Sequence, residues 1–184
     1  MARDTLSRSL HDLGLAAWFG GTLANAVALN PASAKADSQT GTGAVANAGW
    51  DRWTPVNAAA IGVHVIGSVG QLVANKGRVT TQEGVLGMTV LKTGLTAAAL
   101  GVTAYSRVLG RKVSAHQSVP AEDATTPAAG TPAEVAQAQK QLTALQWAVP
   151  VLTGALVVVS AYAGEQQRPA EVKAGVARRL LPIG

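Results

Sequence analysis

The chain has 184 residues, of which 48% are hydrophobic, 14% charged and only 4% aromatic, and it contains no cysteine. These proportions do not suit the core of an ordinary soluble domain, and the lack of cysteine excludes a disulfide framework, a thiolate metal site and a thiol nucleophile. The net charge of +5 comes from basic residues beside apolar runs, as in "SRVLGRK" and "ARRLLP", a placement that favours anionic lipid headgroups and argues against nucleic acid.

Four nearly uncharged runs are long enough to cross the hydrocarbon layer of a bilayer, which takes about 20 helical residues. We therefore predict an all-α fold, a four-transmembrane-helix antiparallel bundle that forms a single integral membrane domain. The predicted spans are residues 13–34, 53–75, 84–106 (interrupted only by Lys92) and 141–164. Residues 35–52 and 113–135 are predicted as flexible polar loops, and residues 165–184 as a charged C-terminal tail.

The first run ends at "NPASAKAD", where small residues around Ala34 and Ala36 resemble a signal-peptidase site. A retained helix is favoured over a cleaved signal, because the run exceeds the usual apolar region of about 7 to 15 residues. It also contains Trp18 and Asn25, which are untypical of such a region.

The second and third runs are joined by the short segment "KGRVTTQE", which makes them an antiparallel hairpin. Trp50 and Trp53 stand where the second run begins, as expected for the aromatic belt of a membrane interface. Pro150, in the middle of the fourth run, is predicted to kink that helix and to free the carbonyl of Gln146. Close approach of helix backbones is predicted at the glycines of the second and third runs, namely Gly62, Gly67, Gly70, Gly87, Gly94 and Gly101.

Each run carries polar residues at helical spacing, so that they share one face. In the second run this stripe consists of Asn57, His64, Ser68, Gln71 and Asn75. Unpaired polar groups are costly in hydrocarbon, and we expect the polar faces to turn inward and satisfy one another. Counting 1.5 Å per residue from each presumed inner end predicts a polar midplane cluster, as a candidate ligand site or proton path, of Asn25, His64, Lys92, Thr96 and Thr153.

Lys92 is the most informative residue of this cluster, because a lysine within a span costs about 2.5 to 3.5 kcal/mol on insertion scales. No predicted span contains a carboxylate to pair with it. Lys92 must therefore snorkel to the headgroups, lose its proton or meet an anionic ligand or partner.

His64 has three interpretations: an imidazole bonded between helices, a proton relay, or a haem or metal ligand. A haem held by two histidines needs a second one at the same depth. His11 is a candidate at the helix edge, but the rise per residue places it roughly 16 Å from His64 along the membrane normal. Haem is therefore kept only as an alternative, and no cofactor or metal site is predicted.

The segment "LHDLGLAAWFGGTL" resembles the opening of copper-resistance D-type membrane proteins and related bacterial families, in which a histidine precedes a Trp-apolar-Gly-Gly turn of helix. The matching positions are His11, Trp18, Phe19, Gly20 and Gly21. The resemblance implies a helical bundle of the bacterial inner membrane with a link to copper or redox work. Without cysteine, and with only two methionines, the chain has few soft ligands for copper.

The sequence contains no phosphate-binding glycine loop, no HExxH motif and no catalytic spacing of Ser, His and Asp. We therefore predict a non-enzymatic structural or accessory subunit, or a homo-oligomeric component, surrounded by the lipid bilayer and associated with copies of itself or a larger membrane complex. The alternatives are a small-solute or proton carrier or channel and a haem- or metal-binding redox module. A small excess of Lys and Arg predicts both termini on the cytoplasmic side of a bacterial cytoplasmic membrane.

Overall fold

The computed structural model describes residues 4–116 and 119–180, and the regular structure in these ranges is entirely helical. Helix α1 (Thr5–Ala24) continues through a π-helical turn, η1 (Asn25–Leu29), into α2 (Asn30–Ser33). The other helices are α3 (Gln39–Thr81), α4 (Val85–Ser114), α5 (Ala133–Glu165) and α6 (Pro169–Leu180). The predicted all-α class is confirmed.

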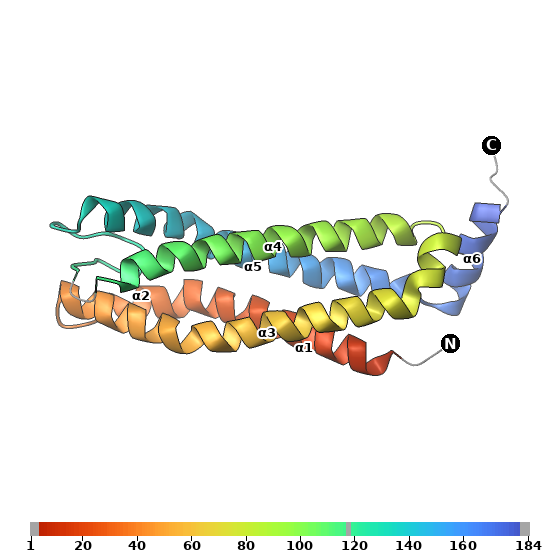
Figure 1. Cartoon of the computed structure of the whole chain (residues 1–184), viewed down its shortest axis with the longest axis horizontal. Coiled ribbons are helices and arrows are strands. Elements are labelled where there is room, and N and C mark those ends of the chain that lie inside the picture. Colours follow the sequence, from red (N-terminus) through yellow and green to blue (C-terminus); the bar gives the residue numbers. More distant parts are fainter. Residues whose placement is uncertain (1–3, 117–118, 181–184) are drawn as a thin grey trace.

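The helices α1, α3, α4 and α5 run antiparallel along one elongated body (Figure 1). Helix α1 packs most extensively against α3, and α4 against α5, while α1 and α5 join the two pairs. Helices α3 and α4 follow each other in the chain but contact each other little. The body therefore consists of two tight helix pairs with an opening between α3 and α4.

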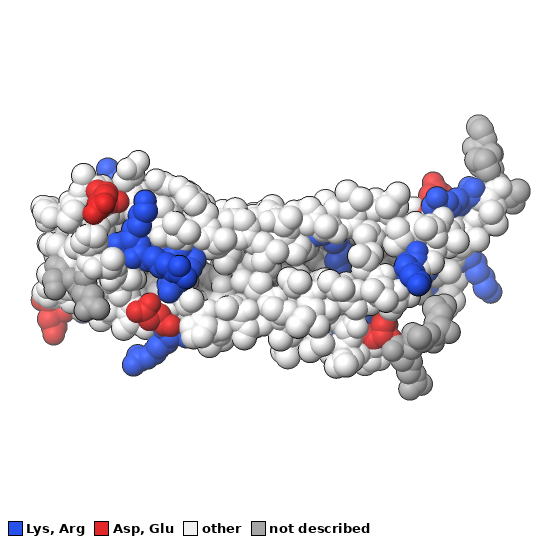
Figure 2. Space-filling model, viewed as in Figure 1, with Lys and Arg blue, Asp and Glu red and all other residues white. Residues whose placement is uncertain are grey.

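The outer surface of this body is apolar, and its interior is partly polar. Helices α3, α4 and α5 are long and apolar enough to cross a membrane. Figure 2 shows charged side chains gathered towards the two ends of the body, with a nearly uncharged belt between them. Ile66, Val158 and other large apolar side chains are exposed on the helices, whereas His64 and Thr153 are fully buried. A soluble protein shows the reverse arrangement, so these features fit a membrane-embedded protein.

The first predicted span, residues 13–34, is formed jointly by α1, η1 and α2. Helix α1 is not one of the three helices with spanning length and composition, because its first half contains Arg8, His11 and Asp12. The predicted four spans are therefore found in part, as three apolar helices and one mixed helical segment.

The π-helical turn accommodates Pro31 within a continuous helical segment. In a regular α-helix, the proline ring would clash with the carbonyl of the residue four positions earlier, Val27. The wider turn avoids this clash, and the Asn30 N–H donates to the carbonyl of Asn25, five residues back. Asn25, Asn30 and Ser33 are all buried in this segment.

The predicted flexible loop 35–52 is wrong over most of its length, since α3 begins at Gln39. The Oγ atom of Ser38 caps the helix by accepting a hydrogen bond of 3.0 Å from the N–H of Gly41. Further along, Gly49 lies directly against the side chain of Leu29. The small residues that suggested flexibility instead allow α3 to pack closely against the end of η1.

The predicted loop 113–135 is shorter than expected, because α4 extends to Ser114 and α5 starts at Ala133. The described residues between them contact the end of the bundle. The Ala121 N–H donates to the carbonyl of Gln39 at 3.1 Å, and the hydroxyl of Thr143 donates to the carbonyl of Thr125 at 3.0 Å.

The predicted C-terminal tail contains a helix, α6, that packs against the turn between α3 and α4. The Glu83 N–H donates to the carbonyl of Gly175 at 3.2 Å. The side chain of Gln82 lies against Gly175 itself. As a result, the start of α1 and all of α6 lie at the same end of the body (Figure 1).

Candidate functional site: the furrow between α3 and α4

The α1–α3 interface is built around two histidines in matching contexts, "HDLG" at 11–14 and "HVIG" at 64–67. A Cβ atom on Gly14 would meet the backbone of His64, and one on Gly67 would meet the backbone of His11. Each glycine therefore provides the space for the histidine of the opposite helix. The Nδ1 atom of His64 lies 3.2 Å from the carbonyl oxygen of His11, which can only accept, so His64 is the donor.

The expected separation of the two histidines is wrong. Instead of lying roughly 16 Å apart along the normal, the imidazole rings have centroids 4.6 Å apart. The reason is the axial offset of the helices: the amide of Asn75 lies 3.5 Å from the carboxylate of Asp4, so α1 begins level with the end of the apolar run of α3. Sequence periodicity predicts the buried face of a helix but not this offset.

The histidine pair is tightly packed. The ring of Trp18 lies 6.0 Å from that of His64, and the Nδ1 atom of His11 lies 2.7 Å from a carboxylate oxygen of Asp12. Neither imidazole lines either cavity described below. Rings at this distance leave no room for a porphyrin between them, and among the described residues no three His, Asp or Glu side chains are placed to hold a metal ion.

Of the residues predicted at the midplane, Asn25 lies apart from His64, and the cluster as a whole stays a prediction. Thr153 is fully buried, and its hydroxyl donates to the carbonyl of Val149 within the same helix at 2.8 Å. Asn25 is buried in η1, roughly 21 Å along the helical segment from His11 and so from His64. Pro150 is buried within α5, which continues as an α-helix on both sides of it.

Lys92 and Thr96 do lie together, on the face of α4 that lines the opening towards α3. The hydroxyl of Thr96 donates to the carbonyl of Lys92 at 2.9 Å. The described residues give Lys92 no ion pair, and the carboxylate of Asp12 in α1 exerts only a longer-range attraction on it. The spacing of polar residues within the predicted spans does not reveal Asp12, because it precedes the first of them by one residue.

The opening between α3 and α4 contains two cavities of about 300 and 350 Å³ that share the side chain of Leu100. We refer to the two together as the furrow. The loop-end cavity lies near the α4–α5 connection and is lined by residues that include Trp53, Asn57 and Arg107. The turn-end cavity lies near the α3–α4 turn and includes Lys92.

In the turn-end cavity, the polar groups largely satisfy one another. The guanidinium of Arg78 donates to the side chains of Gln82 and Asn75, each at 3.0 Å, and to the carbonyl of Gln166 at 2.8 Å. The amide of Asn75 also donates to the carbonyl of Gln71 at 2.8 Å. This network joins the end of α3 to the end of α5.

In the loop-end cavity, one group of polar side chains is satisfied. Asn30 is buried and donates to the side-chain oxygen of Gln146 at 2.7 Å, while the indole N–H of Trp50 donates to Asn30 at 3.0 Å. Asn30 therefore connects α2 with α3 and α5.

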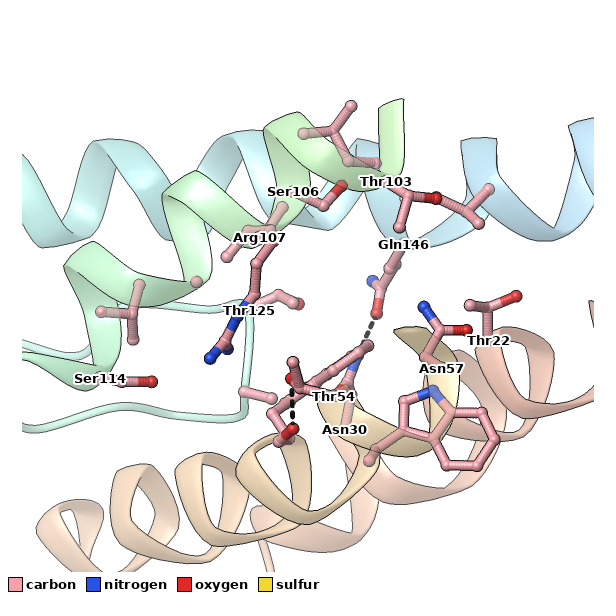
Figure 3. Close-up of a pocket in the computed structure, with 18 of the residues that line it drawn as sticks. Thr22, Asn30, Thr54, Asn57, Thr103, Ser106, Arg107, Ser114, Thr125 and Gln146 are labelled. Atoms are coloured by element: carbon pink, nitrogen blue, oxygen red, sulfur yellow. Dashed lines mark hydrogen bonds between the residues drawn. The ribbon is translucent and has the colours of Figure 1, made fainter. Parts of the chain in front are cut away.

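A second group of polar atoms in the loop-end cavity has no partner. Figure 3 shows the Arg107 side chain reaching from α4 into the cavity, with Asn57 extending from α3. Among the described residues, four buried atoms that belong to lining side chains make no hydrogen bond: Trp53 Nε1, Asn57 Oδ1, Thr103 Oγ1 and Arg107 Nε. Unpartnered buried polar groups are rare, and here the four side chains that carry them belong to the wall of one largely apolar cavity.

Asn30 and Arg107 were not among the residues predicted for the site. The position of Arg107 could have identified it, since it directly follows the third apolar run, where the chain reaches the membrane surface. No feature of the sequence identifies Asn30, because its burial depends on the π-helical turn before Pro31.

Function has to be argued from the structure, because similarity to known proteins gives no guide. No protein-family model, curated protein sequence or solved structure matches the chain. The resemblance of residues 10–23 to copper-resistance D-type proteins stays a prediction. In the described residues, the fold defines an all-helical protein with three helices able to cross a membrane and, between two of them, a largely apolar furrow that contains a few polar groups.

Proposed function

We propose that the chain is a four-span integral membrane protein with a non-enzymatic, accessory role, and that it binds a lipophilic small molecule in the furrow. The observation that carries this proposal is the loop-end cavity, whose unpartnered polar atoms lie within an apolar wall at the side of the bundle. Ligand sites in helical bundles commonly have this character, mostly apolar with a few convergent polar groups.

The arrangement of the ends supports four crossings. The start of α1 and the end of α6 lie at the same end of the body, as an even number of crossings requires (Figure 1). In this proposal the segment from α1 to α2 is retained as the first span, and both ends face the cytoplasm across a bacterial cytoplasmic membrane. Basic residues near that end, including Lys76 and Arg78, agree with this orientation.

The composition of the furrow supports binding over catalysis. None of the described side chains that line its two cavities is a His, Asp or Glu. The furrow therefore offers a ligand hydrogen bonds, positive charge and apolar contact, but no carboxylate or imidazole to act as general base.

The outward face of α4 supports association with a second copy or a larger complex as part of the accessory role. Gly87, Gly94 and Gly101 recur every seven residues on this face, and a Cβ atom on any of them would meet nothing within 4 Å. Contrary to the sequence expectation, these glycines and Gly62 do not mediate close packing within the chain, whereas Gly67 and Gly70 do. Small residues at an uncovered helix face suit helix association in lipid.

Binding can be tested with an environment-sensitive lipophilic fluorophore and the full chain in mild detergent. Leu100→Trp fills the junction of the two cavities and should weaken binding by about tenfold or more, which is about 1.4 kcal/mol. The control is Val158→Trp on the exposed face of α5, away from both cavities and from the glycines of α4, which should bind as the wild type does. A wild-type protein that does not bind the fluorophore, or equal binding by both variants, would overturn the proposal.

The membrane arrangement can be tested on the same preparation and in cells. Because the natural chain has no cysteine, single cysteines at Ala129 and Ala170, both exposed, report topology cleanly. Four spans require labelling from opposite sides of the membrane. Labelling from the same side contradicts four spans, and a strictly monomeric native mass contradicts self-association.

A further inference from the structure

We propose that the ligand of the furrow is a single-chain amphipathic anion, with its acidic head against Arg107 in the loop-end cavity and its acyl chain along the furrow past Leu100. This inference rests on the proposed binding function and adds the chemistry of the ligand. It follows from three features: the charge of the lining, the unpartnered donors, and the position of Arg107 along the bundle.

The charged side chains that line the furrow are all basic: Arg78, Lys92 and Arg107. They differ in the hydrogen bonds that they already make and in their position in the furrow. Arg78 donates to three acceptors in its own network, and Lys92 lines the turn-end cavity, away from the unpartnered polar atoms of the loop-end cavity. Arg107 has a buried Nε without a partner, and its contact with the exposed Asp51 is long, at 4.0 Å. Arg107 is therefore the cation best placed to receive an anion.

The groups around Arg107 add further donors. The indole N–H of Trp53 is buried without an acceptor. The hydroxyl of Thr103 also lacks a partner, whereas the hydroxyls of Thr96 and Thr153 donate to the preceding turn of their own helices. Arg107, Trp53 and Thr103 line the same cavity, and their guanidinium, indole N–H and hydroxyl are donors of the kind that a carboxylate or phosphate accepts, the first as a charge-assisted hydrogen bond.

The position of Arg107 fixes the orientation of the ligand. Arg107 is the first charged residue after the apolar run of α4, so it lies at the level of lipid headgroups in the proposed membrane arrangement. From Arg107 to Lys92 the furrow extends roughly 22 Å along α4. Its wall includes Ile61, Leu100 and Leu145. The cavities of about 300 and 350 Å³ suit one acyl chain better than a two-chain phospholipid.

The test is competition against the lipophilic fluorophore by three probes with the same chain: hexadecanoic acid, hexadecyl phosphate and hexadecanol. We expect at least one acidic probe to bind about tenfold or more tightly than the neutral alcohol, and the tighter acid identifies the head group. Arg107→Gln should reduce the affinity for this acid to that for the alcohol, and Arg107→Lys should restore part of it. Lys112→Gln, an exposed charge removed from the same helix, should change neither.

The outcomes separate the two proposals. If the acids and the alcohol bind equally, or if Arg107→Gln weakens all three probes alike, the acidic head is wrong while binding in the furrow stands. If no probe displaces the fluorophore although Leu100→Trp abolishes its binding, the single-chain ligand is wrong. If the wild-type protein does not bind the fluorophore at all, both proposals fail.

Discussion

Gly67→Ala should separate α1 from α3 and destabilise the protein. The added Cβ would lie 2.6 Å from the carbonyl oxygen of Ser7 and 2.7 Å from the Cα of His11, whereas ordinary contacts begin near 3.4 Å. The backbone N of His11 would lie closer still, and because all three neighbours are backbone atoms, the helices must move apart by more than about 0.8 Å. That movement also stretches the 3.2 Å bond between His64 and the carbonyl of His11 beyond useful hydrogen-bond length.

The magnitude follows from three contributions. Overpacking of this kind costs about 1 to 3 kcal/mol, and an interhelical hydrogen bond in a membrane protein contributes about 0.6 kcal/mol. The higher helix propensity of alanine offsets up to about 1 kcal/mol. We expect a net loss of about 1 to 2 kcal/mol, a roughly 5- to 30-fold fall in the ratio of folded to unfolded protein.

The assay is unfolding by SDS in mixed micelles, followed by the fluorescence of Trp18 and the other tryptophans. Gly62→Ala is the matched control, because it lies in the same helix and its Cβ would meet nothing within 4 Å. It should be neutral or slightly stabilising. Gly14→Ala, which meets the backbone of His64, should behave like Gly67→Ala. Equal stability of the Gly67 and Gly62 variants would refute the reasoning.

Two further predictions concern the polar networks at the ends of the furrow. Asn30→Ala leaves the half-buried side chains of Trp50 and Gln146 without these hydrogen bonds and should lower stability by about 1 to 2 kcal/mol in thermal unfolding. Asn57→Ala should cost less than about 0.5 kcal/mol, and similar losses for both would contradict the role of Asn30. Arg78→Gln should speed hydrogen exchange in the α3–α4 turn about tenfold, because it removes the hydrogen bond to the carbonyl of Gln166. The control, Lys76→Gln, should leave the exchange rate as it is. An unchanged rate in Arg78→Gln would show that the Arg78 network does not stabilise the α3–α4 turn.

The sequence predicts the helices and their buried faces well, because both follow from local patterns. For example, the helical spacing of polar residues predicts that His64 faces inward, and its imidazole is fully buried. The offset between α1 and α3 was not predictable in the same way, since it depends on how the two His-x-x-Gly segments meet. Nor does spacing alone distinguish Gly67, which lies against another helix, from Gly94, which faces outward.

The candidate site was harder to predict than the fold. Lys92 and Thr96 were found from spacing, and they do line the furrow. The furrow itself arises because α3 packs on α1 and α4 on α5, and neither preference is visible in a single sequence. The burial of Asn30 depends on a π-helical turn that local propensity does not predict.

The matching His-x-x-Gly segments also have a consequence for the order of assembly during synthesis. All the residues of the two His-x-x-Gly segments belong to α1 or α3. This first helix pair can therefore pack together before α4 and α5 have left the ribosome. Helices α4 and α5, followed by α6, then pack against the α1–α3 pair that has already formed. The furrow lies between the helix pair that is synthesised first and the pair that is synthesised second. It is therefore complete only when α5 has packed into place.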